Sequence, residues 1–174
     1  MITPNHLSVL GIIHTAISIL AILAGLFAMF SYGKIEMTKQ WGKSFIWLTI
    51  FTCLTGFPIM RFGHPTPGHY LGVIILVMLP IAIYARQLRI FGKFADYVQL
   101  VLLSSTFFFS FIPAINETLT RLPISSPVAS GPDDPIVQTS LLILLIIMIA
   151  AITYQVIKLK RIKKTGEAPN PALN

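Results

Sequence analysis

The sequence predicts an all-α integral membrane protein with five transmembrane helices. The chain has 174 residues, of which 55% are hydrophobic and only 11% are charged. A soluble domain carries about 25% charged residues, so most of this protein's surface must face lipid. Five apolar runs, each near the ~20 residues that cross a ~30 Å hydrocarbon core, give the number of helices. They are predicted at about residues 7–31, 44–60, 67–87, 94–117 and 136–157.

The first run is a retained helix, because it exceeds the ~7–15 residues of a signal-peptide core and no Lys or Arg precedes it. Small or polar residues recur along it in steps of three and four, which places them on one helical face. These residues are Gly11, His14, Ser18, Ala21, Gly25 and Ala28. Small-residue faces allow membrane helices to approach closely, so this face should contact partner helices.

The second run is the shortest, and a re-entrant segment is the alternative to a full span. Its small and polar stripe consists of Thr49, Thr52, Cys53 and Gly56. Pro58 should end it. In the third run Thr66 suits an N-cap and Pro67 the first helical position, and Pro80 predicts a kink.

The fourth run presents one polar face, consisting of Gln99, Thr106, Ser110 and Glu117. The fifth run is almost entirely Leu, Ile and Ala through its middle, so we expect it to pack outside a four-helix bundle formed by the others. Residues 1–158 then form the transmembrane domain, and residues 159–174 form a basic, disordered cytoplasmic tail.

The basic residues predict the orientation. Of the 13 Lys and Arg, all except Arg61 and Arg121 lie in the loop after the first run, the loop after the third run or the C-terminal tail. The positive-inside rule therefore predicts an outside N-terminus and a cytoplasmic C-terminus. Since topology explains the net charge of +7, no nucleic-acid partner is expected. The expected partners are the lipid bilayer and either another membrane subunit or further copies of this chain.

This topology gathers ionisable residues at the outer ends of the helices, where such groups mark candidate sites. The candidates are His14, Arg61, His64, His69, Ser110 and Glu117. One hypothesis is a b-type haem with His14 and His69 as axial ligands. Another is a divalent metal held by His69, His64 and Glu117. A third is structural: His14 hydrogen-bonds a Ser or Thr inside the bundle, while His64 and His69 lie at the wet interface.

Each of the remaining candidates has a structural explanation as well as a functional one. Arg61 could bind an anionic head group or could extend to the interface, and Glu117 is expected to pair with Arg121 four residues later. No phosphate-binding glycine loop, Ser/His/Asp set or metalloprotease motif is present. The sequence thus favours a non-enzymatic accessory or small-ligand-binding membrane protein with its polar site on the periplasmic side. The alternatives are the haem-binding electron-transfer protein and a small transporter lined by Ser110, Thr106, Gln99 and His14.

Four segments of the chain resemble a family of small, uncharacterised, multi-pass proteins of the bacterial inner membrane. The segments are HTAISILAILAG, TGFPIMRFGHPTPGHYLG, FFFSFIPAINETLTRLP and GPDDP, within residues 7–157. The resemblance implies a helical protein of the bacterial inner membrane and distant kinship with di-haem b-type cytochromes. It also implies family histidines at His14 and His69. This chain has Gln40 and Ser110 where relatives often carry histidines, which argues against a second haem.

Overall fold

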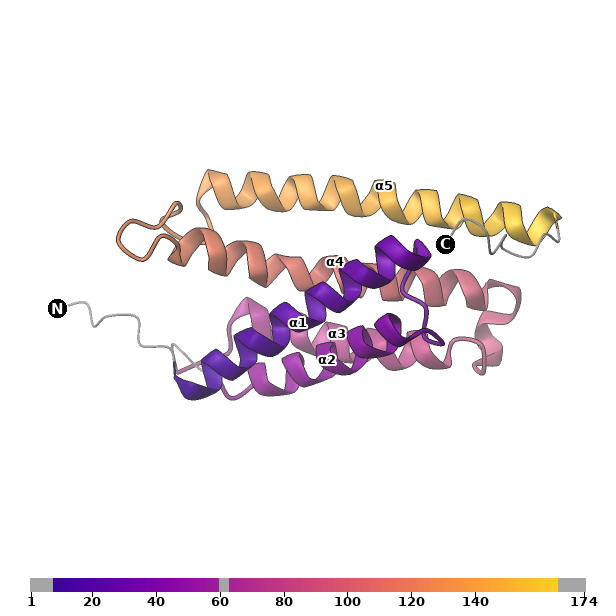
Figure 1. Ribbon diagram of the computed structural model, residues 1–174, viewed down its shortest axis with the longest axis horizontal. Helices are drawn as coiled ribbons and strands as arrows, with labels where there is room; N and C mark the ends of the chain where they lie inside the picture. Colours follow the sequence, from indigo (N-terminus) through magenta and orange to yellow (C-terminus); the bar gives the residue numbers. More distant parts are fainter. Residues whose placement is uncertain (1–7, 60–62, 166–174) are drawn as a thin grey trace. The chain divides into compact units, whose positions relative to one another are not determined.

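The computed structural model describes residues 8–59 and 63–165, and these residues are entirely helices, turns and loops. Five α-helices and one short 3-10 helix follow one another along the chain (Figure 1). They are α1 (Val9–Tyr32), α2 (Gln40–Gly56), α3 (Pro67–Tyr84), η1 (Arg89–Phe94), α4 (Ala95–Arg121) and α5 (Pro135–Thr165). The prediction of an all-α fold is confirmed for this part of the chain.

Within the described residues, four helical segments are long and apolar enough to cross a membrane. They are Val9–Tyr32, Pro67–Tyr84, Arg89–Arg121 and Pro135–Thr165. The chain is therefore an all-helical protein with the properties of a multi-pass membrane protein. Helix α2 has 17 residues and a length of about 26 Å, which is slightly less than a ~30 Å hydrocarbon core. It was the shortest of the predicted spans, and its crossing of the membrane stays a prediction.

The contacts divide the chain into two compact units, Met1–Pro80 and Ile81–Asn174, which are described separately below. The division falls within α3, immediately after Pro80. Proline has no N–H to donate to the preceding turn of a helix, so it weakens the backbone ladder at this point. A kink was predicted here, and the helix continues through the proline to Tyr84.

In the first unit α1 packs along α2 through small side chains. The side chain of Ser8 caps α1 by accepting a hydrogen bond from the Gly11 amide at 3.1 Å. Gly33 ends the helix in a left-handed conformation with φ of 69°, which glycine adopts without strain. The buried residues of α1 are Gly11, Ala21, Ala24, Gly25 and Ala28. Four of these five belong to the predicted small-residue face, and the lack of large side chains permits the close approach.

In the second unit α4 and α5 lie side by side (Figure 1). Ser104 on α4 donates a hydrogen bond of 2.7 Å to the Gln155 side chain on α5, and both residues are buried. Away from water such a bond is costly to leave unmade, so it fixes the register of the two helices. The prediction that α5 lies at an edge of the molecule overlooked this polar contact. A four-helix bundle formed by α1–α4 remains a proposal, since the two units are described separately.

Asp134 caps the N-terminus of α5. Its carboxylate accepts hydrogen bonds of 3.0 Å from the amide and hydroxyl of Ser130 and from the Ile136 amide. The Ser130 amide, then the Ile136 amide and the Ser130 hydroxyl, hold the pKa of the Asp134 carboxyl below its ordinary value, because all three stabilise the ionised form. The polar loop before α5 is thereby joined to the first turn of the helix.

The far end of α5 differs from the prediction. A disordered tail was expected from residue 159, whereas α5 continues as a regular helix to Thr165. Lys and Arg are good helix formers, and cations at a helix C-terminus interact favourably with the helix dipole. The rest of the predicted tail, residues 166–174, lies outside the described residues.

Candidate functional site

The first unit brings His14 of α1 to the end of α2. The Nδ1 atom of His14 lies 3.2 Å from Oγ1 of Thr55. The Thr55 hydroxyl donates a hydrogen bond to the Phe51 carbonyl at 2.8 Å, so its oxygen accepts a hydrogen bond from His14 Nδ1–H. This assigns the ring proton to Nδ1 and makes Nε2 the acceptor of the neutral imidazole. The hypothesis that His14 bonds a hydroxyl inside the bundle agrees with this geometry.

Gly56, the last residue of α2, makes room for the His14 ring. A Cβ atom at Gly56 would lie 3.0 Å from Cε1 and 3.5 Å from Nδ1 of His14. The first distance is shorter than an ordinary van der Waals contact. The ring therefore lies directly against the α2 backbone, in a position that a side chain at residue 56 would disturb.

His69 lies on the first turn of α3, where it closes a reciprocal helix cap. The Thr66 amide donates to His69 Nδ1 at 3.0 Å, and the Thr66 hydroxyl lies 2.9 Å from the same atom. The His69 amide in turn donates to the Thr66 carbonyl at 2.9 Å. This is the spacing of a capping box, in which the third helical residue reaches back to the N-cap amide. Thr66 and Pro67 were predicted as the helix start, and the structure agrees.

The cap determines which nitrogen of His69 carries the proton. A backbone N–H can only donate, so His69 Nδ1 must be the unprotonated nitrogen, and the neutral ring carries its proton on Nε2. This Nε2 atom is shielded from solvent, and it has no hydrogen-bond partner among the residues that the structure describes. A buried donor without an acceptor costs about 1–3 kcal/mol, so it calls for an explanation.

An aromatic side chain and glycine residues surround His69. The ring of Phe57, the residue after α2, has its centroid 6.4 Å from that of His69, at an interplanar angle of 35°. A Cβ atom at Gly72, one turn further along α3, would lie 3.5 Å from the Phe57 ring. Gly56 and Phe57 are consecutive, and they contact His14 and His69 respectively. The end of α2 is thus the element on which both histidines converge.

The hydroxyl of Thr52 is a further polar group near this end of α2. Thr52 Oγ1 is buried and, within the described part of the chain, has no hydrogen-bond partner. It lies three residues before Thr55, which is one helical turn. We use the name histidine site for His14, Thr52, Thr55, Phe57 and His69.

The other predicted site residues lie outside the histidine site or serve local structure. His64 is exposed, and its Nδ1 donates to the Pro65 carbonyl at 3.1 Å. Arg61 lies outside the described residues. In the second unit, Glu117 forms the expected ion pair with Arg121. Ser110 donates to the Thr106 carbonyl one turn earlier at 3.0 Å.

The described residues contain no cluster of three or more His, Cys, Asp and Glu side chains suited to a metal ion. The hypothesis of a metal held by His69, His64 and Glu117 therefore gains no support from this part of the chain. The two proposed haem ligands also differ from each other. Haem-ligating histidines bind iron through a bare ring nitrogen while the other nitrogen donates a proton to the protein. His14 has this arrangement, whereas His69 has the opposite one.

Comparisons with protein-family models, with curated proteins and with solved structures find no match to this chain. The interpretation of the site therefore depends on its own geometry. His14 and His69 were predicted from the sequence as site residues, whereas Thr55 and the role of Phe57 were not predicted. The three-residue spacing of Thr66 and His69, the same as in a capping box, was the available signal for the reciprocal cap.

Gly56 provides a test of the His14 position. In Gly56→Ala the new methyl group must displace the His14 ring and weaken its bond to Thr55, at a cost of about 1 kcal/mol. The matched control is Gly72→Ala, whose methyl group would meet Phe57 at an ordinary contact distance of 3.5 Å. Thermal unfolding in detergent should show a lower Tm for Gly56→Ala than for Gly72→Ala. Equal Tm values would contradict the close packing of His14 on Gly56.

Proposed function

We propose that this chain is a five-span membrane protein that binds a small ligand at the histidine site. The observation that carries the proposal is the buried N–H of His69 Nε2, which has no acceptor among the described residues. Burial of a donor is tolerated where a ligand or an ordered water completes its hydrogen bond. The ligand that suits this donor carries an oxygen acceptor, such as a carbonyl or a carboxylate.

The surroundings narrow the class of ligand further. Phe57 and the glycines beside the two rings offer aromatic and backbone surface rather than charged partners. A site of this kind, apolar with a few directed polar groups, is typical of small-molecule pockets. The site favours a compact, largely apolar molecule whose polar end accepts the His69 proton. Thr52 and His14 supply additional polar groups on the α1 and α2 side.

The haem alternative fits the residues less well. Iron ligation by His69 Nε2 would require a bare nitrogen, which the bond from the Thr66 amide opposes. Ligation through a flipped ring would break the capping box of α3. Of the residues proposed to line a transport path, Ser110 and Gln99 donate to the backbone carbonyls of Thr106 and Ala82 respectively.

The proposed topology places the N-terminus outside and the C-terminus in the cytoplasm, and the distribution of Lys and Arg supports it. With this topology the histidine site lies toward the periplasm if the membrane is the bacterial inner one, as the family resemblance implies. A C-terminal fusion to green fluorescent protein should then be fluorescent in cells. A dark fusion, together with an active C-terminal alkaline phosphatase fusion, would contradict this orientation.

The variant His69→Gln distinguishes the ligand-binding role of His69 from its capping role. Glutamine at the third helical position preserves the capping box, because its carbonyl can accept from the Thr66 amide, but it removes the imidazole donor. His69→Ala removes both, so it should also lose about 1 kcal/mol of stability. Protein purified from membranes is extracted with organic solvent, and the extracts are compared by mass spectrometry.

We expect a small molecule in the wild-type extract that is reduced at least about tenfold in His69→Gln, the equivalent of 1.4 kcal/mol. The Tm of His69→Gln should stay close to that of the wild type, which shows that the loss is not unfolding. Identical extracts would contradict ligand binding at His69. A Soret band in the purified wild type that His14→Ala abolishes would favour haem instead.

A further inference from the structure

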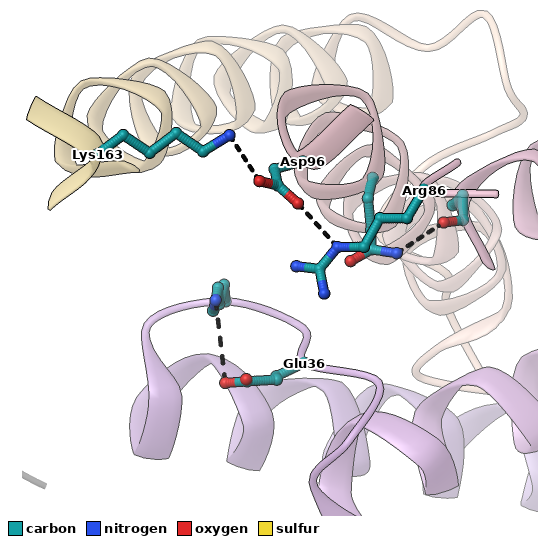
Figure 2. A network of polar contacts seen from close by, with 7 residues as sticks. Glu36, Arg86, Asp96 and Lys163 are labelled. Carbon is teal, nitrogen blue, oxygen red and sulfur yellow. Dashed lines mark hydrogen bonds and ion pairs between the residues drawn. The ribbon is translucent and has the colours of Figure 1, made fainter. Parts of the chain in front are cut away.

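The second unit carries a basic surface at the end where α4 begins and α5 ends. Asp96, in the first turn of α4, accepts from Arg86 Nε at 2.7 Å, and its other oxygen lies 2.5 Å from Lys163 Nζ of α5 (Figure 2). The connection from α3 to α4, the start of α4 and the end of α5 therefore meet at one carboxylate. Lys163 Nζ also lies 4.9 Å from the centre of the Tyr97 ring, which adds a cation–π contact.

The charges at this end are almost entirely positive. Between residues 86 and 96 and between residues 158 and 165, every charged residue except Asp96 is Lys or Arg. The single carboxylate is shared between two of these cations, so the remaining ones have no carboxylate partner within these two ranges. They are Arg89, Lys93, Lys158, Lys160, Arg161 and Lys164. We use the name basic end for these six residues together with Arg86 and Lys163.

The connection from α3 to α4 also exposes apolar side chains between its basic ones. Ile90 is 84% exposed and Phe94 is 58% exposed, and η1 has no buried residue. In water such exposure would be unfavourable, whereas a short segment that alternates Arg or Lys with large apolar side chains suits the boundary of head groups and acyl chains. Gly92, with φ of 43°, permits the sharp kink within η1.

Helix α5 is long enough for its basic last turns to reach the head-group layer, at the same depth as η1. Its 31 residues span about 46 Å, which exceeds the ~30 Å hydrocarbon core by about 16 Å. The Lys and Arg residues of this helix begin only at Lys158, in its last two turns. These turns reach the head-group layer while the apolar part of the helix fills the core. The bond from Lys163 to Asp96 holds them beside η1.

We propose that the basic end is a binding surface for anionic phospholipid head groups of the adjacent leaflet. Lipid phosphates would interact with Arg89, Lys93 and Lys160, while Ile90 and Phe94 insert beside the acyl chains. Basic residues near an anionic membrane surface are attracted to its head groups. Asp96 positions the surface by joining Arg86 and Lys163. This inference is independent of the proposed ligand at the histidine site.

The test measures lipid retention by the full chain in detergent. Native mass spectrometry compares retained dioleoyl-phosphatidylglycerol with dioleoyl-phosphatidylcholine, which has the same acyl chains and no net charge. The test variant is Arg89→Gln/Lys93→Gln/Lys160→Gln, which leaves the ion pairs of Asp96 intact. The matched control, Lys34→Gln/Lys39→Gln/Lys43→Gln, removes the same number of charges from the loop between α1 and α2 and from the first turn of α2.

The wild type should retain more phosphatidylglycerol than phosphatidylcholine. The ratio of the two retained lipids should fall at least about tenfold in the test variant and should change little in the control. Raising the salt concentration from about 0.05 M to about 0.5 M should weaken the wild-type preference, because salt screens exposed charges. An unchanged preference in the test variant, or an equal loss in the control, would overturn the proposal. A wild type without any preference for phosphatidylglycerol would also overturn the proposal. That result is expected if the basic end binds an acidic protein and not lipid.

Discussion

The interpretation of the histidine site depends on one hydrogen bond, from the Thr66 amide to His69 Nδ1. The bond begins α3 by satisfying a backbone donor that the helix itself leaves without a partner. It also fixes the proton of the His69 ring on Nε2, inside the protein. A local requirement of helix capping thus creates a directed donor at the end of α2. Gly56 has no side chain, so the His14 ring lies directly against the α2 backbone. The Phe57 ring, which faces Gly72, lies near His69.

The two described units show different uses of polar groups in a largely apolar chain. In the first, hydroxyls and imidazoles form short-range bonds around the end of α2. In the second, the buried Ser104–Gln155 bond joins α4 and α5 within their apolar length, and Asp96 joins them at the basic end. Isolated exposed ion pairs contribute little to stability, so the Asp96 contacts serve mainly to position the basic residues.

The sequence predicted the helices well, because apolar runs of membrane length and helix-start signals such as Thr66–Pro67 are local properties. The small-residue face of α1 followed from helical periodicity, and Gly11, Ala21, Gly25 and Ala28 are indeed buried. The helical continuation of α5 to Thr165 was missed because a run of Lys and Arg resembles a solvated tail. The Ser104–Gln155 bond was missed because periodicity does not determine which side chains of two helices meet. His14 and His69 were selected for their depth, whereas their protonation depends on partners that only the three-dimensional structure reveals.

The central claim, a buried His69 donor on Nε2, is tested most directly by the ring nitrogen resonances in ¹⁵N-histidine NMR of the detergent-solubilised protein. His14→Gln and His69→Gln variants assign the signals. We expect the N–H of the His69 ring on Nε2 and the N–H of the His14 ring on Nδ1. A His69 ring that carries a proton on Nδ1 would contradict this assignment. This result would mean that the Thr66 amide does not donate to this ring.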